Sequence, residues 1–313
     1  MARVAIIGAG AMGSVYAGLM ASAGHEVYAV TAWPDHAAAM QKNGLRVEGI
    51  SGDRTVKVHA STTTDGIPVC DLVMITTKAP DVEAAAKSAL PLLGPNTPVQ
   101  AIQNGLGSAE KIASIVGADR TVVGIVGGFG ASMRAPGHAH HNGMVIVHFG
   151  PYGKQAPKDM EASAEIWRSA GFDVELYEDT DRMVWEKLIM NVCFSGACTL
   201  TGMTIGQVLE DPDAWQVAKG CAEEAVAVGK AKGIKFGFSD PIAHIRSIGG
   251  QIPNARPSML LDHMVRRRSE IHVINGSIPR EGRKVGMPTP INDTVVALVK
   301  AREKDFTNTG TGL

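Results

Sequence analysis

Neither sign of charge is in excess in this sequence, in which 30 Lys and Arg residues stand against 31 Asp and Glu residues. A net charge of −1 provides no electrostatic attraction for nucleic acid or for an anionic membrane surface, so we expect neither as a partner. Long hydrophobic runs are also lacking, and none approaches the ~18–20 residues that span a bilayer. The apolar run at residues 4–7 ends in glycines, which is typical of a first strand and not of a signal peptide. We therefore expect a cytoplasmic protein.

The sequence also lacks the spacing of a metal site. Four cysteines lie among apolar residues, which is typical of buried free thiols in a reducing compartment: Cys70, Cys193, Cys198 and Cys221. Histidines are concentrated between His138 and His148, but strand alternation would place His138 and His140 on one face and His141 on the other. We expect no metal cofactor.

Up to about residue 125, short β-rich apolar runs alternate with helical patterns such as residues 79–93. Strands that are apolar on both faces and joined by helices indicate a parallel, doubly wound sheet. The expected strands are residues 3–8, 25–30, 71–77, 97–103 and 120–126. An Asn142-Gly143 pair within residues 137–150 predicts a hairpin with a type I′ turn.

A helix and a strand, at residues 160–171 and 173–178, are expected to complete the first domain. Strand signals then stop, and three long segments have helical patterns: residues 181–200, 213–233 and 257–286. The sequence predicts the α/β class, with an amino-terminal Rossmann domain and a carboxy-terminal all-α domain. The expected domains are residues 1–178 and 179–313.

Three glycines form the pattern G-x-G-x-x-G between the first strand and a helix of small residues. In a dinucleotide-binding turn the first glycine permits the tight turn, the second lets the backbone approach the pyrophosphate, and the third lets helix and strand pack closely. The free N–H groups of the helix then face the phosphates. We expect this turn to bind the cofactor through Gly8, Gly10, Ala11, Met12 and Gly13.

The end of the second strand normally distinguishes NAD from NADP, through an acid for the ribose hydroxyls or an Arg for the 2′-phosphate. Neither signature is present, because Thr31, Ala32 and Trp33 occupy the position. Thr31 could hydrogen-bond either cofactor. Trp33 could stack on the adenine or serve as a hydrophobic lid. The choice between NADP and NAD stays open.

Polar residues also occur where the pattern favours apolar ones. Lys78 and Asn104 each follow a predicted strand, and ligands of open α/β sheets bind outside the carboxyl ends of strands. Lys187, Asn191 and Ser195 recur every four residues and form a polar stripe on an otherwise apolar helix. Buried lysine and amide groups need partners, so this stripe indicates a polar cleft.

Together these stretches resemble the ketopantoate reductase (2-dehydropantoate 2-reductase) family along the whole chain. The matching motifs are GAGAMG at residues 8–13, TTKA at 76–79, IQNG at 102–105, WEKL at 185–188, PSML at 257–260, EI..ING at 270–276 and TGTGL at 309–313. The resemblance implies an NAD(P)-dependent oxidoreductase that interconverts a 2-keto acid and a 2-hydroxy acid in a cleft between the two domains. Reduction of 2-dehydropantoate to pantoate, in pantothenate biosynthesis, is the first candidate reaction.

The resemblance also implies roles for individual residues. Lys187 matches the family's catalytic lysine, which protonates the carbonyl oxygen as hydride arrives from the nicotinamide. Glu270 matches the glutamate that holds and polarises the site and contacts the cofactor. Asn104 and Lys78 match positions on the cofactor side, and Asn104 is also expected to contact the substrate. The other expected substrate-binding residues are Asn191, Ser195 and Ser258.

Ser258 and Glu270 can reach one small substrate only if the helix breaks between them, since 12 residues of α-helix span ~18 Å. The family often has a Gly-Arg-Pro-Thr-type break before the glutamate, whereas this chain offers Ser269 as a candidate N-cap.

Two departures from the family pattern affect specificity. Trp33 stands where the family usually has the Arg for the 2′-phosphate, and Ser195 stands where it usually has a second Asn. These changes favour a second hypothesis, an NAD-dependent 2-hydroxyacid dehydrogenase with another substrate. A non-catalytic dinucleotide sensor is a third, and the retained Lys187 and Glu270 argue against it. A large helical second domain often dimerises, so a homodimer is an alternative to a monomer.

Overall fold

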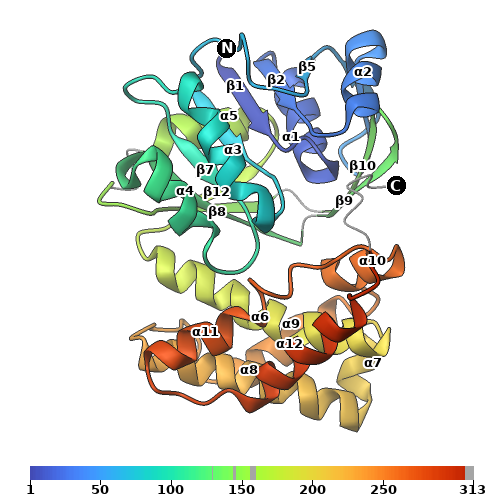
Figure 1. Cartoon of the computed structure of the whole chain (residues 1–313), viewed down its shortest axis with the longest axis vertical. Coiled ribbons are helices and arrows are strands. Elements are labelled where there is room, and N and C mark those ends of the chain that lie inside the picture. The colour runs from blue at the N-terminus through green and yellow to red at the C-terminus, as the bar shows by residue number, and fades with distance from the viewer. Residues whose placement is uncertain (129, 144–145, 156–159, 307–313) are drawn as a thin grey trace. The chain divides into compact units, whose positions relative to one another are not determined.

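The computed structural model describes residues 1–128, 130–143, 146–155 and 160–306 (Figure 1). The TGTGL motif at residues 309–313 lies outside the described residues. The described chain forms two compact units: unit 1 holds residues 1–103 and 108–180, and unit 2 holds residues 104–107 and 181–306. No helix in the described part of the chain is long and apolar enough to cross a membrane.

Unit 1 is built on an eight-stranded sheet of order β12-β11-β8-β7-β6-β1-β2-β5. The strands from β8 to β5 are parallel, and β11 joins β8 in antiparallel orientation and pairs with β12 in parallel. The predicted doubly wound sheet is therefore confirmed. Its strands are β1 (Arg3–Ile7), β2 (Glu26–Val30), β5 (His59–Ser61), β6 (Leu72–Ile75), β7 (Val99–Ala101), β8 (Thr121–Gly127), β11 (Ile146–Pro151) and β12 (Asp173–Leu176).

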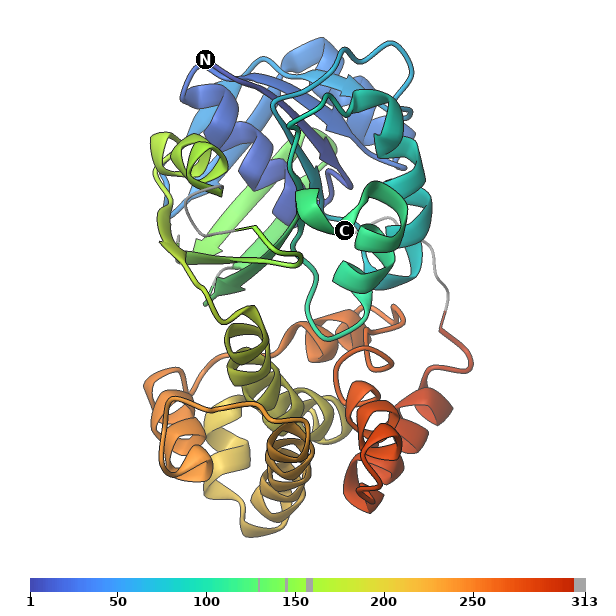
Figure 2. The same ribbon diagram turned by 90° about the vertical axis from the view of Figure 1, so that its left-hand side faces the viewer.

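Helices cover both faces of this sheet (Figure 2). Val4 and Ile6 of β1 join a cluster that includes residues of α1 and α5, while Ala5 and Ile7 join a second cluster with residues of α3 and α4. A strand that is buried on both faces has to be apolar throughout, which explains its unbroken hydrophobic run. The helices of unit 1 are α1 (Ala11–Ser22), α2 (Pro34–Asn43), α3 (Val82–Ala89), α4 (Ser108–Val116) and α5 (Glu161–Ser169).

A second sheet of order β4-β3-β10-β9 completes unit 1, and it contradicts the predicted hairpin at Asn142-Gly143. Its strands are β3 (Leu45–Gly49), β4 (Arg54–Val56), β9 (Gly130–Ala135) and β10 (His138–Gly143). The antiparallel partner of β10 is β9, and the chain turns between them at Gly137, whose φ is +75°, so this glycine takes the role assigned to Gly143. The hairpin at Asn142-Gly143 is wrong because β10 and β11 belong to different sheets.

Strand alternation in β10 is as predicted, since His138 and His140 both contact Glu48, at 3.1 and 3.2 Å, while His141 is buried. Among the described residues, no group of three or more His, Cys, Asp or Glu side chains is arranged to hold a metal ion. The four cysteines are free and buried.

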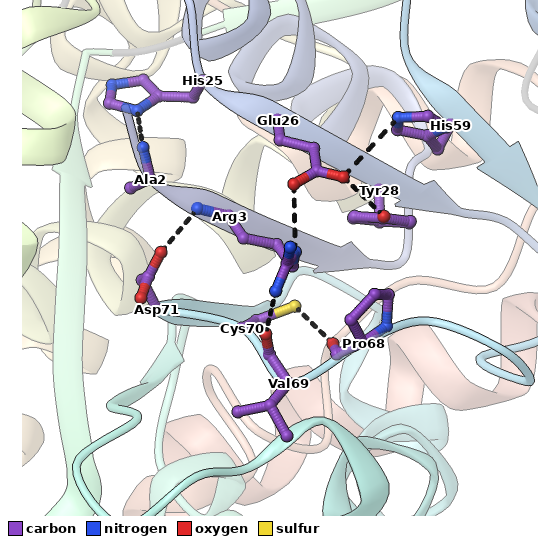
Figure 3. A network of polar contacts seen from close by, with 10 residues as sticks. All are labelled: Ala2, Arg3, His25, Glu26, Tyr28, His59, Pro68, Val69, Cys70 and Asp71. Atoms are coloured by element: carbon purple, nitrogen blue, oxygen red, sulfur yellow. Dashed lines mark hydrogen bonds and ion pairs between the residues drawn. The ribbon is translucent and has the colours of Figure 1, made fainter.

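A polar network joins the amino-terminal ends of the central strands (Figure 3). Arg3 Nε donates to Glu26 Oε2 at 3.0 Å, and Arg3 Nη1 donates to the Val69 carbonyl at 2.8 Å. The Arg3 backbone N–H donates to Asp71 Oδ2 at 2.7 Å. Because ligands bind beyond the carboxyl ends of parallel strands, this network secures the edge of the sheet that is opposite the expected site.

Unit 2 is helical, as predicted, but the third predicted segment, residues 257–286, contains two short helices with turns between them instead of one long helix. The helices of unit 2 are α6 (Thr180–Thr201), α7 (Ile205–Glu210), α8 (Pro212–Ala231), α9 (Pro241–Gln251), α10 (Ser258–Met264), α11 (Ser277–Lys284) and α12 (Pro290–Arg302). Local sequence explains several helix starts. Thr204 and Gln207 form a capping box at α7, and Asp211 and Asp240 cap α8 and α9 just before a proline.

Candidate active site

The glycine turn lies between β1 and α1, and its three glycines meet different surroundings. Gly8 has φ +107°, and a Cβ there would lie 2.4 Å from the Thr77 nitrogen. A Cβ on Gly13 would lie 2.6 Å from the Gly8 carbonyl oxygen. Gly10 is exposed, and a Cβ there would meet only that oxygen, at 3.9 Å. The fold itself thus needs Gly8 and Gly13, whereas Gly10 leaves open space in front of the helix.

This turn fits the pyrophosphate of a dinucleotide. Gly10 is the N-cap of α1, so no side chain caps the helix, and no acidic residue occurs in its first turn. The helix therefore presents backbone N–H groups and the positive end of its dipole to the open space at Gly10.

The loop after β2 is organised by His36, a histidine without a distinctive sequence pattern. His36 is buried; its Nε2 contacts Ser14 Oγ at 2.9 Å, and its Nδ1 accepts the Gly137 N–H at 2.7 Å. Burial lowers the pKa of His36 to about 4, so the imidazole is neutral at neutral pH. The Trp33 ring stacks on it with centroids 5.3 Å apart, and the Trp33 N–H contacts Thr31 Oγ1 at 3.3 Å.

Lys78 is exposed and lies three residues beyond the end of β6, just before a 3₁₀ turn at Ala79–Asp81. Gln103 joins this segment to the end of β7, because its Nε2 donates to the carbonyls of Ile75 at 2.7 Å and Thr77 at 3.1 Å. Gln103 Oε1 and Thr77 Oγ1 are buried with no hydrogen-bond partner among the described residues. Unpaired buried oxygens at the carboxyl ends of two strands are consistent with a polar ligand there.

In unit 2, the polar stripe of α6 is present. Lys187 and Asn191 are partly buried, and Ser195 is buried. Removal of its ammonium from water lowers the pKa of Lys187 to about 8, and the negative charge of Glu270 opposes this shift. The Glu270 side chain is itself buried. A lysine with this pKa can both donate and accept a proton near neutral pH.

The helix does break between Ser258 and Glu270. Ser258 is the exposed first residue of α10, which ends at Met264, and Arg266 has a φ of +53°. Ser269 is not an N-cap: its backbone N–H and its hydroxyl both donate to Glu303 Oε1, at 2.8 and 2.5 Å. That prediction is wrong because a buried carboxylate far along the chain takes both donors.

Two contacts connect the turn after Glu270 with α6 and with the loop that contains Asn104. Asn275, which is fully buried, donates to the Val192 carbonyl of α6 at 2.9 Å. The Leu106 N–H donates to the Val273 carbonyl at 3.0 Å, which holds the loop of Asn104 in unit 2. Asn104 thus belongs to the same unit as Lys187 and Glu270, whereas the strand before it belongs to unit 1.

The parallel sheet and the glycine turn after its first strand define the class of Rossmann-type dinucleotide-binding proteins. Residues 4–154 match the family model of ketopantoate reductase PanE/ApbA, and residues 179–303 match the model of its C-terminal part. The chain therefore belongs to the ketopantoate reductase family.

Individual relatives agree along almost the whole chain. The 2-dehydropantoate 2-reductase of Archaeoglobus fulgidus is 30% identical, over 96% of this chain and 98% of its own. A PanE/ApbA family ketopantoate reductase from Ralstonia eutropha JMP134 superposes with a TM-score of 0.87 at 33% identity, covering 96% of this chain and 98% of the other. A D-mandelate dehydrogenase, solved with NADH and anilino(oxo)acetate, superposes with a TM-score of 0.89 at 25% identity and the same coverage.

Proposed function

We propose that this protein reduces 2-dehydropantoate to pantoate, a step of pantothenate biosynthesis, with Lys187 as the proton donor. The observation that carries the proposal is the partly buried lysine of α6, whose pKa is about 8 and which interacts electrostatically with Glu270. An ammonium at a carbonyl oxygen stabilises the alkoxide that develops there and then protonates it.

A nicotinamide dinucleotide held by this chain would supply the hydride that adds to the carbonyl carbon. Lys187 Nζ transfers its proton to the carbonyl oxygen, so the product is a neutral alcohol group, and solvent then reprotonates the lysine. Glu270 favours the protonated lysine before the transfer. In the oxidation direction, neutral Lys187 accepts the alcohol proton.

The remaining candidate residues have binding roles in this proposal. Asn191, Ser195, Ser258 and Asn104 bind the substrate through amide and hydroxyl groups. The pyrophosphate would be held at Gly8, Gly10, Ala11, Met12 and Gly13, and the adenosine at Thr31 and Trp33. Lys78, Asn104 and Glu270 would serve the nicotinamide end.

We further propose that the preferred cofactor is NADH. No Lys or Arg occurs between residues 31 and 41, and Asp35 lies in the first turn of α2. A 2′-phosphate at this loop would meet a carboxylate where an Arg is required. The test is a fluorescence titration with NADH and NADPH. NADPH binding that is about tenfold tighter or more would overturn the preference.

A second candidate substrate is another 2-keto acid, and Ser195 favours it. A serine hydroxyl is shorter than the amide of Asn and changes the space and hydrogen bonding available to the substrate side chain. A panel of 2-keto acids, assayed by NADH consumption, tests both candidates: the proposal expects 2-dehydropantoate to have the highest kcat/KM. A higher value for an aromatic or unbranched acid would support the second.

Two further expectations stay predictions, a homodimer and a cytoplasmic location. Light scattering during gel filtration tests the first, and fractionation of the native host tests the second.

A further inference from the structure

The Asn104–Gly107 loop is a short excursion of the chain between β7 and α4, yet it belongs to unit 2. Leu106 makes the hydrogen bonds that connect this loop to the rest of unit 2. The Leu106 N–H donates to the Val273 carbonyl at 3.0 Å, and the Leu106 carbonyl accepts from Arg280 Nη2 at 3.2 Å. Because both polar backbone groups of Leu106 are held, the loop has a defined orientation relative to the turn that contains Val273.

This loop requires such anchoring, because two of its residues are glycines with positive φ, +82° at Gly105 and +107° at Gly107. Glycine loses more conformational freedom on ordering than any other residue. The approach at Gly105 is also very close, since a Cβ there would lie 2.1 Å from the Val273 carbonyl oxygen. The loop and the turn are therefore fitted to each other.

Arg280 also contacts a group of charged side chains that belong to α11 and to Lys232, the C-cap residue of α8. Its Nε contacts Glu281 Oε1 at 3.4 Å, and the buried Glu281 accepts from Lys232 at 2.7 Å and Lys284 at 2.9 Å. Burial alone would raise the pKa of Glu281, but the two lysines hold it well below its ordinary value. The carboxylate stays charged and keeps Arg280 directed at the loop.

The turn on the other side of the loop begins at the candidate active-site glutamate. The Val273 N–H donates to the Glu270 carbonyl at 3.1 Å, so Leu106, Val273 and Glu270 are connected in series through backbone hydrogen bonds. We propose that Arg280 is a positioning residue for the reaction, which holds the Leu106 carbonyl and thereby keeps Asn104 in place beside the turn of Glu270. This inference rests on the proposed role of Asn104 in substrate binding.

The first test replaces Arg280, whose hydrogen bond to the Leu106 carbonyl we call the clamp, and leaves the proposed binding residues unchanged. Arg280→Met is compared with Arg283→Met, an exposed arginine on the same helix. Loss of a hydrogen bond from a charged donor is expected to raise the KM for the 2-keto acid about tenfold in Arg280→Met, with kcat reduced less. For Arg283→Met, we expect the NADH dissociation constant, the melting temperature and the kinetics all to stay at wild-type values. An unchanged KM in Arg280→Met would overturn the proposal.

A double-mutant cycle separates positioning from a general structural role. If Arg280 acts through Asn104, the Arg280→Met change is expected to have little further effect on KM in an Asn104→Ala background. The same increase in both backgrounds would overturn the proposal.

Hydrogen exchange tests the clamp without turnover. The amide of Leu106 is expected to exchange at least about tenfold faster in Arg280→Met than in Arg283→Met, because the loop opens more often. Equal exchange rates of the Leu106 amide in the two variants would contradict the proposed role of Arg280, even if the enzyme is active. Faster exchange in a protein that reduces no 2-keto acid would support the clamp and overturn the proposed function instead.

Discussion

Two helices that are buried on most of their surface, α1 and α6, serve the proposed site in different ways. In α1, every residue from Gly13 to Met20 is buried, and the helix offers its amino-terminal backbone. In α6, most residues from Met183 to Thr199 are buried, and the helix offers the side chains of its polar stripe. Recognition of a pyrophosphate by the backbone of α1 requires glycines. Proton transfer from α6 requires the ammonium group of Lys187, whose charged form is destabilised by burial.

The two helices are constrained in different ways. The constraint on α1 is steric, since Gly18 lies so close to β3 that a Cβ there would be 2.3 Å from Val47 Cγ2. At α6 it is electrostatic, since burial destabilises the charged form of Lys187 and Glu270 only partly compensates. Substitutions at α1 should therefore affect packing or cofactor binding, and substitutions at α6 should affect the rate and its pH dependence.

The largest expected effect is that of Lys187→Met. Without the proton donor, kcat for 2-keto acid reduction should fall by about 10³-fold, within the usual range for general acid catalysis. NADH affinity, measured by fluorescence titration, should be unchanged because Lys187 is not among the residues proposed to hold the cofactor. Turnover at the wild-type rate would remove Lys187 from the mechanism.

The glycine turn offers a matched pair of substitutions. Gly10→Ala should keep the wild-type melting temperature but weaken NADH binding by about tenfold or more, because the methyl group occupies the space in front of the helix. Gly13→Ala should lower the melting temperature as well, since its Cβ would meet the Gly8 carbonyl oxygen at 2.6 Å. Wild-type NADH affinity in Gly10→Ala would contradict pyrophosphate binding at this turn.

The pH dependence tests the electrostatic half of the comparison. Reduction requires protonated Lys187, so its rate should fall as pH rises through about 8, whereas oxidation of the 2-hydroxy acid should rise through the same pH. In Glu270→Gln the supporting negative charge is lost, so both midpoints should move to lower pH. A reduction rate that does not change from about pH 6 to about pH 10 would exclude Lys187 as the titrating group.

The smallest expected effect concerns the cofactor loop. Trp33→Arg introduces a cation for a 2′-phosphate and should improve NADPH binding by about fivefold relative to NADH, a modest gain because the loop is partly exposed. Fluorescence titration of both cofactors measures the ratio. An unchanged ratio would show that Trp33 does not lie at the adenosine ribose.

The two helices also differ from the rest of the site in how much the sequence reveals. The glycine turn and the polar stripe of α6 are local patterns, and both are present at the predicted residues. Their signals depend only on the period of a helix and on the few conformations open to a tight turn.

Other parts of the site depend on contacts between distant residues. His36 is hydrogen-bonded to Gly137, which is 101 residues away in the sequence, and Arg280 is hydrogen-bonded to Leu106, which is 174 residues away. Neither residue has a distinctive local pattern, so only the folded chain identifies it. The wrong hairpin at Asn142-Gly143 has the same origin, since β10 pairs with β3, a strand about 90 residues earlier in the sequence.

Isotope labelling tests directly whether this protein transfers hydride from NADH to 2-dehydropantoate. The wild-type protein and Lys187→Met are incubated with 2-dehydropantoate and NADH deuterated at both C4 positions, and the product is examined by mass spectrometry. We expect pantoate with one deuterium, bonded to C2, from the wild type, and about 10³-fold slower formation from the variant. Unlabelled pantoate, or no reduction by a wild-type protein that binds NADH, would contradict the proposed function.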